Sequence, residues 1–328
     1  MQQIHALRVY KDQGTQLESL PPPRPKEGEV LIHSQYSSIN YKDALAVTGL
    51  GKILRTLPMI PGIDVAGEIL LSNDDRFNVG DSVLVTGCGL GECFDGGYAE
   101  QVKVAADFVI PCPDGLTPRE AMTIGTAGFT AALAIQRMEE NHQTPADGPI
   151  VVTGASGGVG SMAIDMLAGR GYDVTAISGK TTAFDYLKKL GASEIINREE
   201  LDLGQRPLEE ARWAGAIDNV GGKILAGLTR TMKPRGNIAA IGLTGGFELQ
   251  TTVMPFILRG INLLGINSVD CPMPLRHQLW TRLAEALKPR ALEQIISTEL
   301  SLSEVATYCE SMINGSTYGR AIVNLQSV

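Results

Sequence analysis

The stretch Val151–Gly160, VVTGASGGVG, has the residues and spacing of a phosphate-binding turn. An apolar run precedes the small residues and a helical pattern follows them, which is the context in which such a turn holds a pyrophosphate. Gly157 and Gly158 have no Cβ atom, so the backbone can approach phosphates, and Gly160 lets the helix pack close to the strand. Amides at a helix start, with the helix dipole, favour these anions. The turn predicts a dinucleotide site, and a tight turn without a ligand is the alternative.

The next strand indicates which dinucleotide binds. An NAD site usually has Asp or Glu about 20 residues after the glycine turn, where the acid binds the ribose 2′-hydroxyl. Here the strand ends in AISGK without a carboxylate, and Ser178, Gly179 and Lys180 stand in its place. Arg198, after the third strand, adds a guanidinium, and a 2′-phosphate needs such donors. We therefore predict NADPH rather than NADH; Lys180 alone could be an ordinary solvated lysine, so the missing acid is the stronger observation.

The hydrophobic pattern predicts two kinds of domain around this turn. From residue 149 strands alternate with helices, which is typical of a mostly parallel, doubly wound sheet. Before residue 112 short strands alternate with glycine-rich turns, which indicates a small barrel-like domain. A buried, alanine-rich helix at 120–138 should link the two, and the last strand, 319–325, should return to the first domain. The other expected strands are 28–39, 64–71, 81–87, 98–104, 149–154, 173–178, 193–197, 215–220, 237–242 and 261–266, and the other expected helices are 159–171, 183–192 and 301–313.

Composition excludes several classes of protein. A length of 328 residues predicts about two domains, and a net charge of −8 argues against nonspecific nucleic-acid binding. No apolar run approaches the roughly 20 residues that span a bilayer, and the N-terminus lacks the pattern of a secretory signal. Five scattered cysteines favour a reducing compartment, so we expect a cytoplasmic protein without a membrane or nucleic-acid partner.

Five segments together resemble the medium-chain dehydrogenase/reductase superfamily. They are SSINYKD (37–43), PMIPGIDVAGEI (58–69), VGDSVL (79–84), GTAGFTAALAI (125–135) and VVTGASGGVG. The resemblance implies an α/β fold, with a GroES-like β-barrel catalytic domain over 1–120 and 296–328 and a Rossmann NADPH-binding domain over 121–295. Short-chain dehydrogenases have a similar turn, but near the N-terminus and with a Tyr-x-x-x-Lys pair. About 150 residues precede the turn here, and none of the eight tyrosines has Lys four positions later.

The zinc ligands of the superfamily are replaced in this chain. Zinc-dependent members have Cys where Asn40 stands and Gly-His-Glu where Gly62, Ile63 and Asp64 stand. The cysteines are too few and too far apart for a four-ligand structural site, so we predict no metal. This departure points to the zinc-independent quinone oxidoreductase and enoyl reductase branch, and within it the chain looks most like NADPH-dependent acryloyl-CoA reductases.

The resemblance implies reduction of acryloyl-CoA to propionyl-CoA, with hydride transfer to the β-carbon and no metal. Asn40 and Tyr41 are expected to line the pocket where nicotinamide and substrate meet. The Tyr41 hydroxyl is the candidate for orienting the cofactor ribose or substrate, or for relaying the proton; a packed aromatic is the alternative. Asp43 is expected to be a structural partner of the loop. A reductase of quinones or other enones and a non-catalytic NADPH-binding sensor or structural protein remain alternatives.

The remaining predicted contacts also depend on the resemblance. Lys52 and Arg55 are candidates for binding the phosphates of CoA, or are solvated charges. For Ile257 a core position is equally compatible with the sequence, and for Asn314 a helix-ending turn. The family commonly forms homodimers through the edge strand of the nucleotide domain, here 261–269. The predicted cofactor contacts are Ser156, Gly157, Gly158, Val159, Leu243, Ile257, Ser268 and Asn314.

Overall fold

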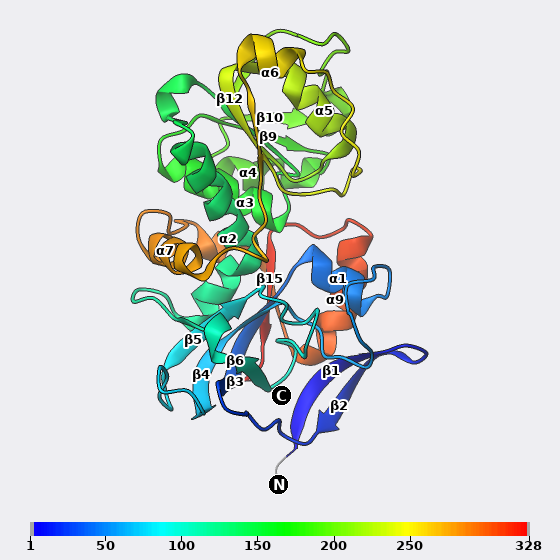
Figure 1. Ribbon diagram of the computed structural model, residues 1–328. Coiled ribbons are helices and arrows are strands. Elements are labelled where there is room, and N and C mark those ends of the chain that lie inside the picture. Colours follow the sequence, from blue (N-terminus) through cyan, green and yellow to red (C-terminus); the bar gives the residue numbers. More distant parts are fainter. Residues whose placement is uncertain (1–2, 327–328) are drawn as a thin grey trace. The chain divides into compact units, whose positions relative to one another are not determined.

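The computed structural model describes residues 3–326 as two compact units (Figure 1). Unit 1 runs to Thr126 and includes Val269–Glu285 and the chain from Leu292 onward; unit 2 comprises Ala127–Ser268 and Ala286–Ala291. The limits expected from the sequence, 1–120 with 296–328 and 121–295, stay a prediction. No helix among the described residues is long and apolar enough to cross a membrane.

Unit 1 is built on a mainly antiparallel sheet of short strands. Its order is β14-β15-β3-β4-β5-β7, and β6 pairs with β3 on the remaining part of that long strand. The predicted return of the last strand is confirmed, because β15 pairs with β3 and with β14. The strands are β1 (Ile4–Tyr10), β2 (Gly14–Leu20), β3 (Glu29–Ile39), β4 (Asp64–Ser72), β5 (Ser82–Thr86), β6 (Gln101–Ala105), β7 (Ile110–Pro111), β14 (Ile296–Leu300) and β15 (Arg320–Asn324).

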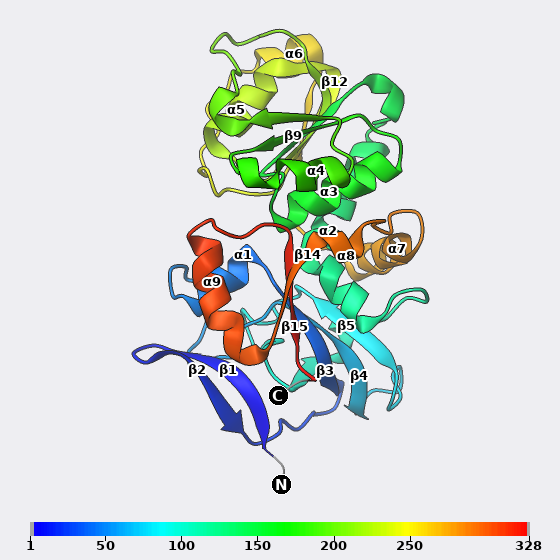
Figure 2. The same cartoon turned by 180° about the vertical axis from the view of Figure 1, so that it is seen from behind.

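Two helices of unit 1 pack against each other. Both views show α9 (Val305–Ile313) beside α1 (Tyr41–Val47), and one apolar core joins Val47 to Val305 and Cys309 (Figures 1 and 2). The pattern did not predict α1, the hairpin of β1 and β2, or β14. It also missed two further helices of this unit, α7 (Met273–Ala284) and α8 (Leu292–Ile295).

The long helix α2 (Pro118–Glu140) contains the helix predicted at 120–138 and is interrupted near its start. Thr117 and Glu120 form a capping box, in which the Thr117 main-chain amide donates to the Glu120 carboxylate at 2.9 Å. At Gly125 the backbone leaves the helical region, with φ 48° and ψ −159°. Only glycine adopts that conformation readily, so the residue marks a built-in kink.

Unit 2 is a parallel six-stranded sheet in the order β10-β9-β8-β11-β12-β13. This is the predicted doubly wound arrangement, and the α/β fold class is confirmed. Apolar residues of the central strands, such as Val151 and Ile238, pack with Leu225 and Leu228 in one core. The strands are β8 (Ile150–Thr153), β9 (Val174–Ser178), β10 (Glu194–Asn197), β11 (Trp213–Asp218), β12 (Met232–Ala240) and β13 (Asn262–Gly265), and the helices are α3 (Gly158–Gly169), α4 (Phe184–Lys189), α5 (Gly222–Thr231) and α6 (Met254–Arg259).

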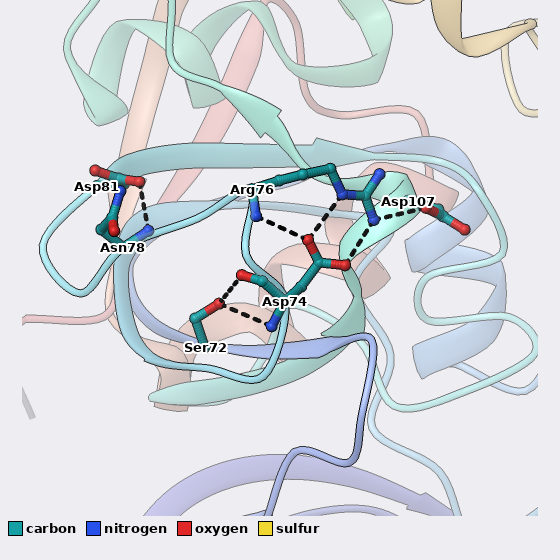
Figure 3. A network of polar contacts seen from close by, with 6 residues as sticks. All are labelled: Ser72, Asp74, Arg76, Asn78, Asp81 and Asp107. Carbon is teal, nitrogen blue, oxygen red and sulfur yellow. Dashed lines mark hydrogen bonds and ion pairs between the residues drawn. The ribbon is translucent and has the colours of Figure 1, made fainter.

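The turn that joins β4 to β5 is held by charged side chains near the surface (Figure 3). The Arg76 guanidinium donates to both carboxylate oxygens of Asp74 at 2.8 Å and to Asp107 at 2.7 Å. These hydrogen bonds lower the pKa of Asp74 to about 2. The turn is therefore fixed by a local charge network at the surface.

Candidate functional site

The strand order of unit 2 reverses between β8 and β11, and this point defines where a ligand can bind. β8 pairs with β9 on one side and with β11 on the other. In open parallel sheets the crevice at the carboxyl ends of the strands, at such a reversal, is the usual dinucleotide site. The turn 154–159 follows β8 at this point.

The glycines of this turn have different surroundings. A Cβ atom on Gly160 would lie 2.5 Å from the Gly154 carbonyl oxygen and 2.7 Å from the Ala155 Cα, so this position accepts only glycine. On Gly157, the residue before α3, the nearest atom would be the same oxygen at 3.3 Å. Gly160 thus packs the helix on the strand, whereas Gly157 is exposed at the helix start, with one backbone oxygen near its Cβ position. Amides there have no acceptor within the helix and are available to an anion.

The predicted phosphate-binding residues after β9 lie together. The Ser178 hydroxyl donates to the Ser156 hydroxyl at 3.2 Å and accepts from the Lys180 amide at 3.1 Å. Arg198 covers Gly179, since a Cβ on that glycine would be 3.1 Å from the guanidinium carbon. Partial burial lowers the pKa of the Lys180 ammonium. The end of β9 therefore carries two hydroxyls with the Arg198 guanidinium beside Gly179, and their binding of a phosphate stays a prediction.

A buried carboxylate at the reversal point was not predicted. Asp218 ends β11 and accepts hydrogen bonds from the Thr153 hydroxyl at 2.6 Å and the Gly221 amide at 2.8 Å. The Asn219 amide group donates to the Thr153 carbonyl at 2.8 Å. Burial raises the pKa of Asp218. These bonds tie the loops after β8 and β11 together, and the signal was the polar pair Asp-Asn at the end of an apolar strand.

Two of the other predicted contacts of unit 2 are exposed, and the third, Ser268, is half-buried. Leu243 is 67% exposed and Ile257, on α6, is 73% exposed, so the core position considered for Ile257 is wrong. The Ser268 hydroxyl accepts a hydrogen bond from the Thr130 hydroxyl at 2.9 Å. The cofactor role of these three residues stays a prediction.

In unit 1 the predicted catalytic pair stands at the start of α1. Asn40 is the residue before the helix, and its main-chain amide donates to the Asp43 carboxylate at 2.9 Å. The second oxygen of Asp43 accepts from the Ile63 amide at 2.9 Å, so Asp43 is a structural partner of the loop as expected. Tyr41, the first helical residue, is 45% exposed. Burial, and then the charge of Asp64, raise the pKa of Asp43 to about 7.

Asp64 is the centre of a group of buried hydrogen bonds, which we call the Asp64 cluster. One carboxylate oxygen accepts from the Ser38 hydroxyl at 2.6 Å, the Asn40 amide group at 2.8 Å and the Thr126 amide at 2.9 Å. The other accepts from the Thr126 hydroxyl at 2.5 Å. Asp64 is fully buried, so these donors replace the water that the carboxylate loses.

Arg320 adds a cation to this cluster and was missed by the sequence reasoning. It is 2% exposed, and one terminal nitrogen donates to the Ile39 carbonyl at 2.9 Å and the Asn40 side-chain oxygen at 3.1 Å. The Nε atom donates to the Thr123 carbonyl at 3.0 Å. Burial lowers the pKa of Arg320 while Asp64 and Asp43 oppose that shift. The signal was a lone arginine opening the apolar strand RAIVN.

The remaining predicted residues of unit 1 are exposed. Lys52 and Arg55 lie in the loop after α1, where the Arg55 amide donates to the Glu92 carbonyl at 2.8 Å. Asn314 ends α9 with right-handed backbone angles, and Gly315 adopts the left-handed φ of 73°. The helix-ending turn considered for this segment is confirmed, and a ligand contact at Asn314 stays a prediction.

The fold and these two sites define an α/β protein that pairs a dinucleotide-type turn with a second, barrel-like unit. Residues 26–114 match the family described as alcohol dehydrogenase GroES-like domain, and residues 158–287 match the zinc-binding dehydrogenase family. The chain is 49% identical over 325 residues to the probable acrylyl-CoA reductase AcuI of Escherichia coli, covering 98% of this chain and 100% of that protein.

Two further similarities concern proteins with solved structures. The putative quinone oxidoreductase YhfP of Bacillus subtilis is 49% identical over 92% of this chain and 91% of its own length. Its structure, described with NAD bound, has a TM-score of 0.95 at 45% identity and covers 99% and 100% of the two chains. The structure of Escherichia coli YhdH, described with bound NADPH, has a TM-score of 0.93 at 49% identity over 98% and 99%. The chain belongs to the medium-chain dehydrogenase/reductase superfamily.

The zinc in one family description does not fit the residues of this chain. Among residues 3–326 no group of three or more His, Cys, Asp or Glu side chains lies close enough to hold a metal ion. Asn40 stands with its amide group donating to Asp64, and an NH₂ group cannot ligate a cation. Four donors already occupy the Asp64 carboxylate.

Proposed function

We propose that this protein is an NADPH-dependent reductase of the conjugated C=C bond of a short enoyl thioester, with acryloyl-CoA as the substrate. The observation that carries the cofactor is the end of β9, where Arg198 covers Gly179 beside Ser178 and no carboxylate follows. The reaction class is supported by the 49% identity to a protein named as a probable acrylyl-CoA reductase.

Few protein groups are needed for this reaction. NADPH, when bound, supplies a hydride to the β-carbon of the alkene. Negative charge then develops on the thioester carbonyl oxygen, and the α-carbon takes a proton, which gives the saturated thioester. The protein must align the reacting carbons and donate hydrogen bonds to that oxygen. The Tyr41 hydroxyl is the candidate donor. The side chain of Asn40 bonds to Asp64 and Arg320 and so holds the loop that contains Tyr41.

The proposed binding contacts follow the predicted residues. Ser156, Gly157, Gly158 and Val159 bind the pyrophosphate, and Ser178, Lys180 and Arg198 bind the 2′-phosphate. Lys52 and Arg55 are proposed for the phosphates of CoA. Leu243, Ile257, Ser268 and Asn314 complete the proposed cofactor contacts.

We also propose that the protein is a cytoplasmic homodimer that pairs through β13. This strand is the edge of the six-stranded sheet, and Leu263 on it is exposed. An unpaired apolar edge is an aggregation risk that a symmetry mate relieves. Sedimentation analysis should give twice the mass of 35.0 kDa.

Steady-state oxidation of NADPH by the purified protein tests the function. We expect kcat/KM for acryloyl-CoA to exceed that for a benzoquinone at least tenfold. The opposite ratio would favour a reductase of quinones, a name carried by a relative 49% identical to this chain. If no activated alkene or quinone were turned over, the protein would be a non-catalytic NADPH-binding protein. Titration with NADPH in the absence of substrate would then measure its affinity for the cofactor.

The cofactor contact is tested by Arg198→Ala. A charge-assisted hydrogen bond is worth about 1.5–3 kcal/mol, so kcat/KM for NADPH should fall roughly tenfold or more. The value for NADH should stay within about twofold, because that cofactor lacks the 2′-phosphate. The matched control is Arg206→Ala, since Arg206 is an exposed arginine of the same unit, paired with Glu209. Equal losses with both cofactors would contradict a 2′-phosphate site.

Tyr41→Phe tests the proposed donor. Removal of one hydrogen-bond donor to a developing oxyanion typically lowers kcat by a factor of about 100 or more. We expect that loss with NADPH affinity changed much less. Undiminished turnover would remove Tyr41 from the chemistry.

A further inference from the structure

Arg320 and the Asp64 cluster join four separate segments of unit 1 at one buried point. The segments are the end of β3, the start of β4, the kink of α2 and the start of β15. A Cβ atom on Gly125 would lie within 2.8 Å of the Arg320 guanidinium, the Asp64 carboxylate and the Ser38 hydroxyl. The absence of a Cβ atom at the kink therefore leaves the space in which these three groups meet.

The kink also explains why the arginine is needed. In an uninterrupted helix the Thr126 amide would donate to the Met122 carbonyl. Here the Thr126 amide donates to Asp64 at 2.9 Å, and Arg320 donates to the Met122 carbonyl at 3.4 Å and to the Thr123 carbonyl at 3.0 Å. The guanidinium thus satisfies acceptors at the break in α2.

The side chain of Asn40 has only one orientation compatible with this environment. Its amide nitrogen donates to Asp64 at 2.8 Å and to Asp43 at 3.1 Å, and its oxygen accepts from Arg320 at 3.1 Å. The Asp64 carboxylate only accepts and the Arg320 guanidinium only donates, so a flipped amide would lose its bonds to both groups. Asn40 is consequently fixed from both ends, and Tyr41 is the next residue along the chain.

We propose that Arg320 is a positioning residue of the reductase: its buried guanidinium is the cation that holds Asn40 and thereby orients Tyr41. The role rests on the proposed function.

Arg320→Lys tests the proposal, because lysine keeps the charge and loses the planar fork. We expect kcat with acryloyl-CoA to fall at least tenfold, with the Kd of NADPH, from cofactor fluorescence, within about twofold of wild type. In the Tyr41→Phe background the same change should lower kcat by less than about twofold, since Arg320 acts through Tyr41. Losses that multiply in the double variant, or a parallel loss of NADPH affinity, would show a general structural role and overturn the proposal.

A second measurement is independent of activity. Hydrogen exchange of the peptide containing residues 40–47 should be at least tenfold faster in Arg320→Lys, with the peptide 158–169 unchanged. Unchanged exchange at 40–47 overturns the positioning role even if wild-type enzyme proves inactive with every substrate, so failure of the proposed function is distinguishable. If Arg320→Lys does not fold, Asn40→Ala removes the link while keeping the guanidinium. It should then show the same kcat loss and faster exchange, and wild-type values for both would overturn the proposal.

Discussion

Two arginines of the same unit each face two aspartates, in opposite environments. Arg76 lies on the turn after β4, exposed to solvent, and bonds directly to Asp74 and Asp107 (Figure 3). Arg320 is buried with Asp64 and Asp43 and bonds instead to Asn40 and to main-chain carbonyls. The surface arginine therefore bonds directly to both of its acids, whereas the buried arginine organises the groups between it and its acids.

The difference in burial decides what each arrangement can do. At the surface, water and salt screen the charges, and an ion pair contributes little to stability. In the interior each charge has lost its hydration, so removal of one member leaves the others uncompensated. A buried network is costly to disturb, and for that reason it can hold a loop such as 40–43 in one conformation.

Gly125→Ala should have the largest effect on stability, because the added methyl group would enter the buried network. The φ of 48° is strained for alanine, and the methyl group would meet Asp64 and Arg320 at 2.7 Å. We expect a loss of about 4 kcal/mol or more in unfolding free energy, the sum of backbone strain and overpacking. Urea denaturation measures it.

The control for that variant is Gly28→Ala. Gly28 also has a positive φ, of 73°, but a Cβ there has nothing within 4 Å. The backbone cost alone, about 1–2 kcal/mol, is expected. Equal losses in the two variants would mean that the cluster around Gly125 yields easily, and the contrast with the surface network would fail.

The sequence predicted the parts of this molecule that depend on local pattern. The alternation of strands and helices from residue 149 predicted the parallel sheet. The absence of an acid after β9 directed attention to the polar and cationic residues there, which include Arg198. Each of these signals lies within a few residues of the feature it describes, because strand periodicity and turn composition are local properties.

The buried network could not be predicted in the same way. Asp64 and Thr126 are 62 positions apart, and Asn40 and Arg320 are 280 positions apart. Their meeting depends on the pairing of β15 with β3 and on the kink at Gly125, which no periodic pattern shows. A lone arginine in an apolar strand was the one local sign. The short helix α1 was also missed, since its seven residues are too few for a helical period to be evident.

The pH dependence of the unfolding free energy should show a somewhat smaller effect of the buried network. Burial raises the pKa of Asp43 from 3.8 to about 7, so the folded protein holds a proton that the unfolded chain releases. The stabilisation is complete below pH 4 and is lost as the pH rises toward 7, a loss of roughly 4 kcal/mol at most. The charged or titratable groups that act on Asp43 are Asp64, Tyr98, Cys309 and Arg320.

Asp43→Asn is the matching variant. Its unfolding free energy should change less between pH 5 and 7.5 than that of wild type, and the difference isolates Asp43. Asp165 and Asp218, whose pKa values are also raised by burial, remain in both proteins and cancel. Parallel pH profiles would show that Asp43 is ionised throughout, and the buried network would then carry two full negative charges against one arginine.

Arg76→Met should have the smallest effect on the whole protein and a clear effect on its neighbour. The hydrogen bonds from Arg76 hold the pKa of Asp74 at about 2, so their loss should return that pKa toward 3.8, as measured by carboxyl-carbon NMR titration. The denaturation midpoint at physiological salt should fall less than in Arg320→Met, and kcat should stay at the wild-type value, because Arg76 is exposed and salt screens its ion pairs. Arg320→Met, made in parallel, should lower both. If Arg76→Met lowered kcat or the midpoint as strongly as Arg320→Met, burial would not be what separates the two arginines. In that case the surface turn would have to be coupled to the loop at residues 40–43, and hydrogen exchange of that loop in Arg76→Met would reveal the coupling.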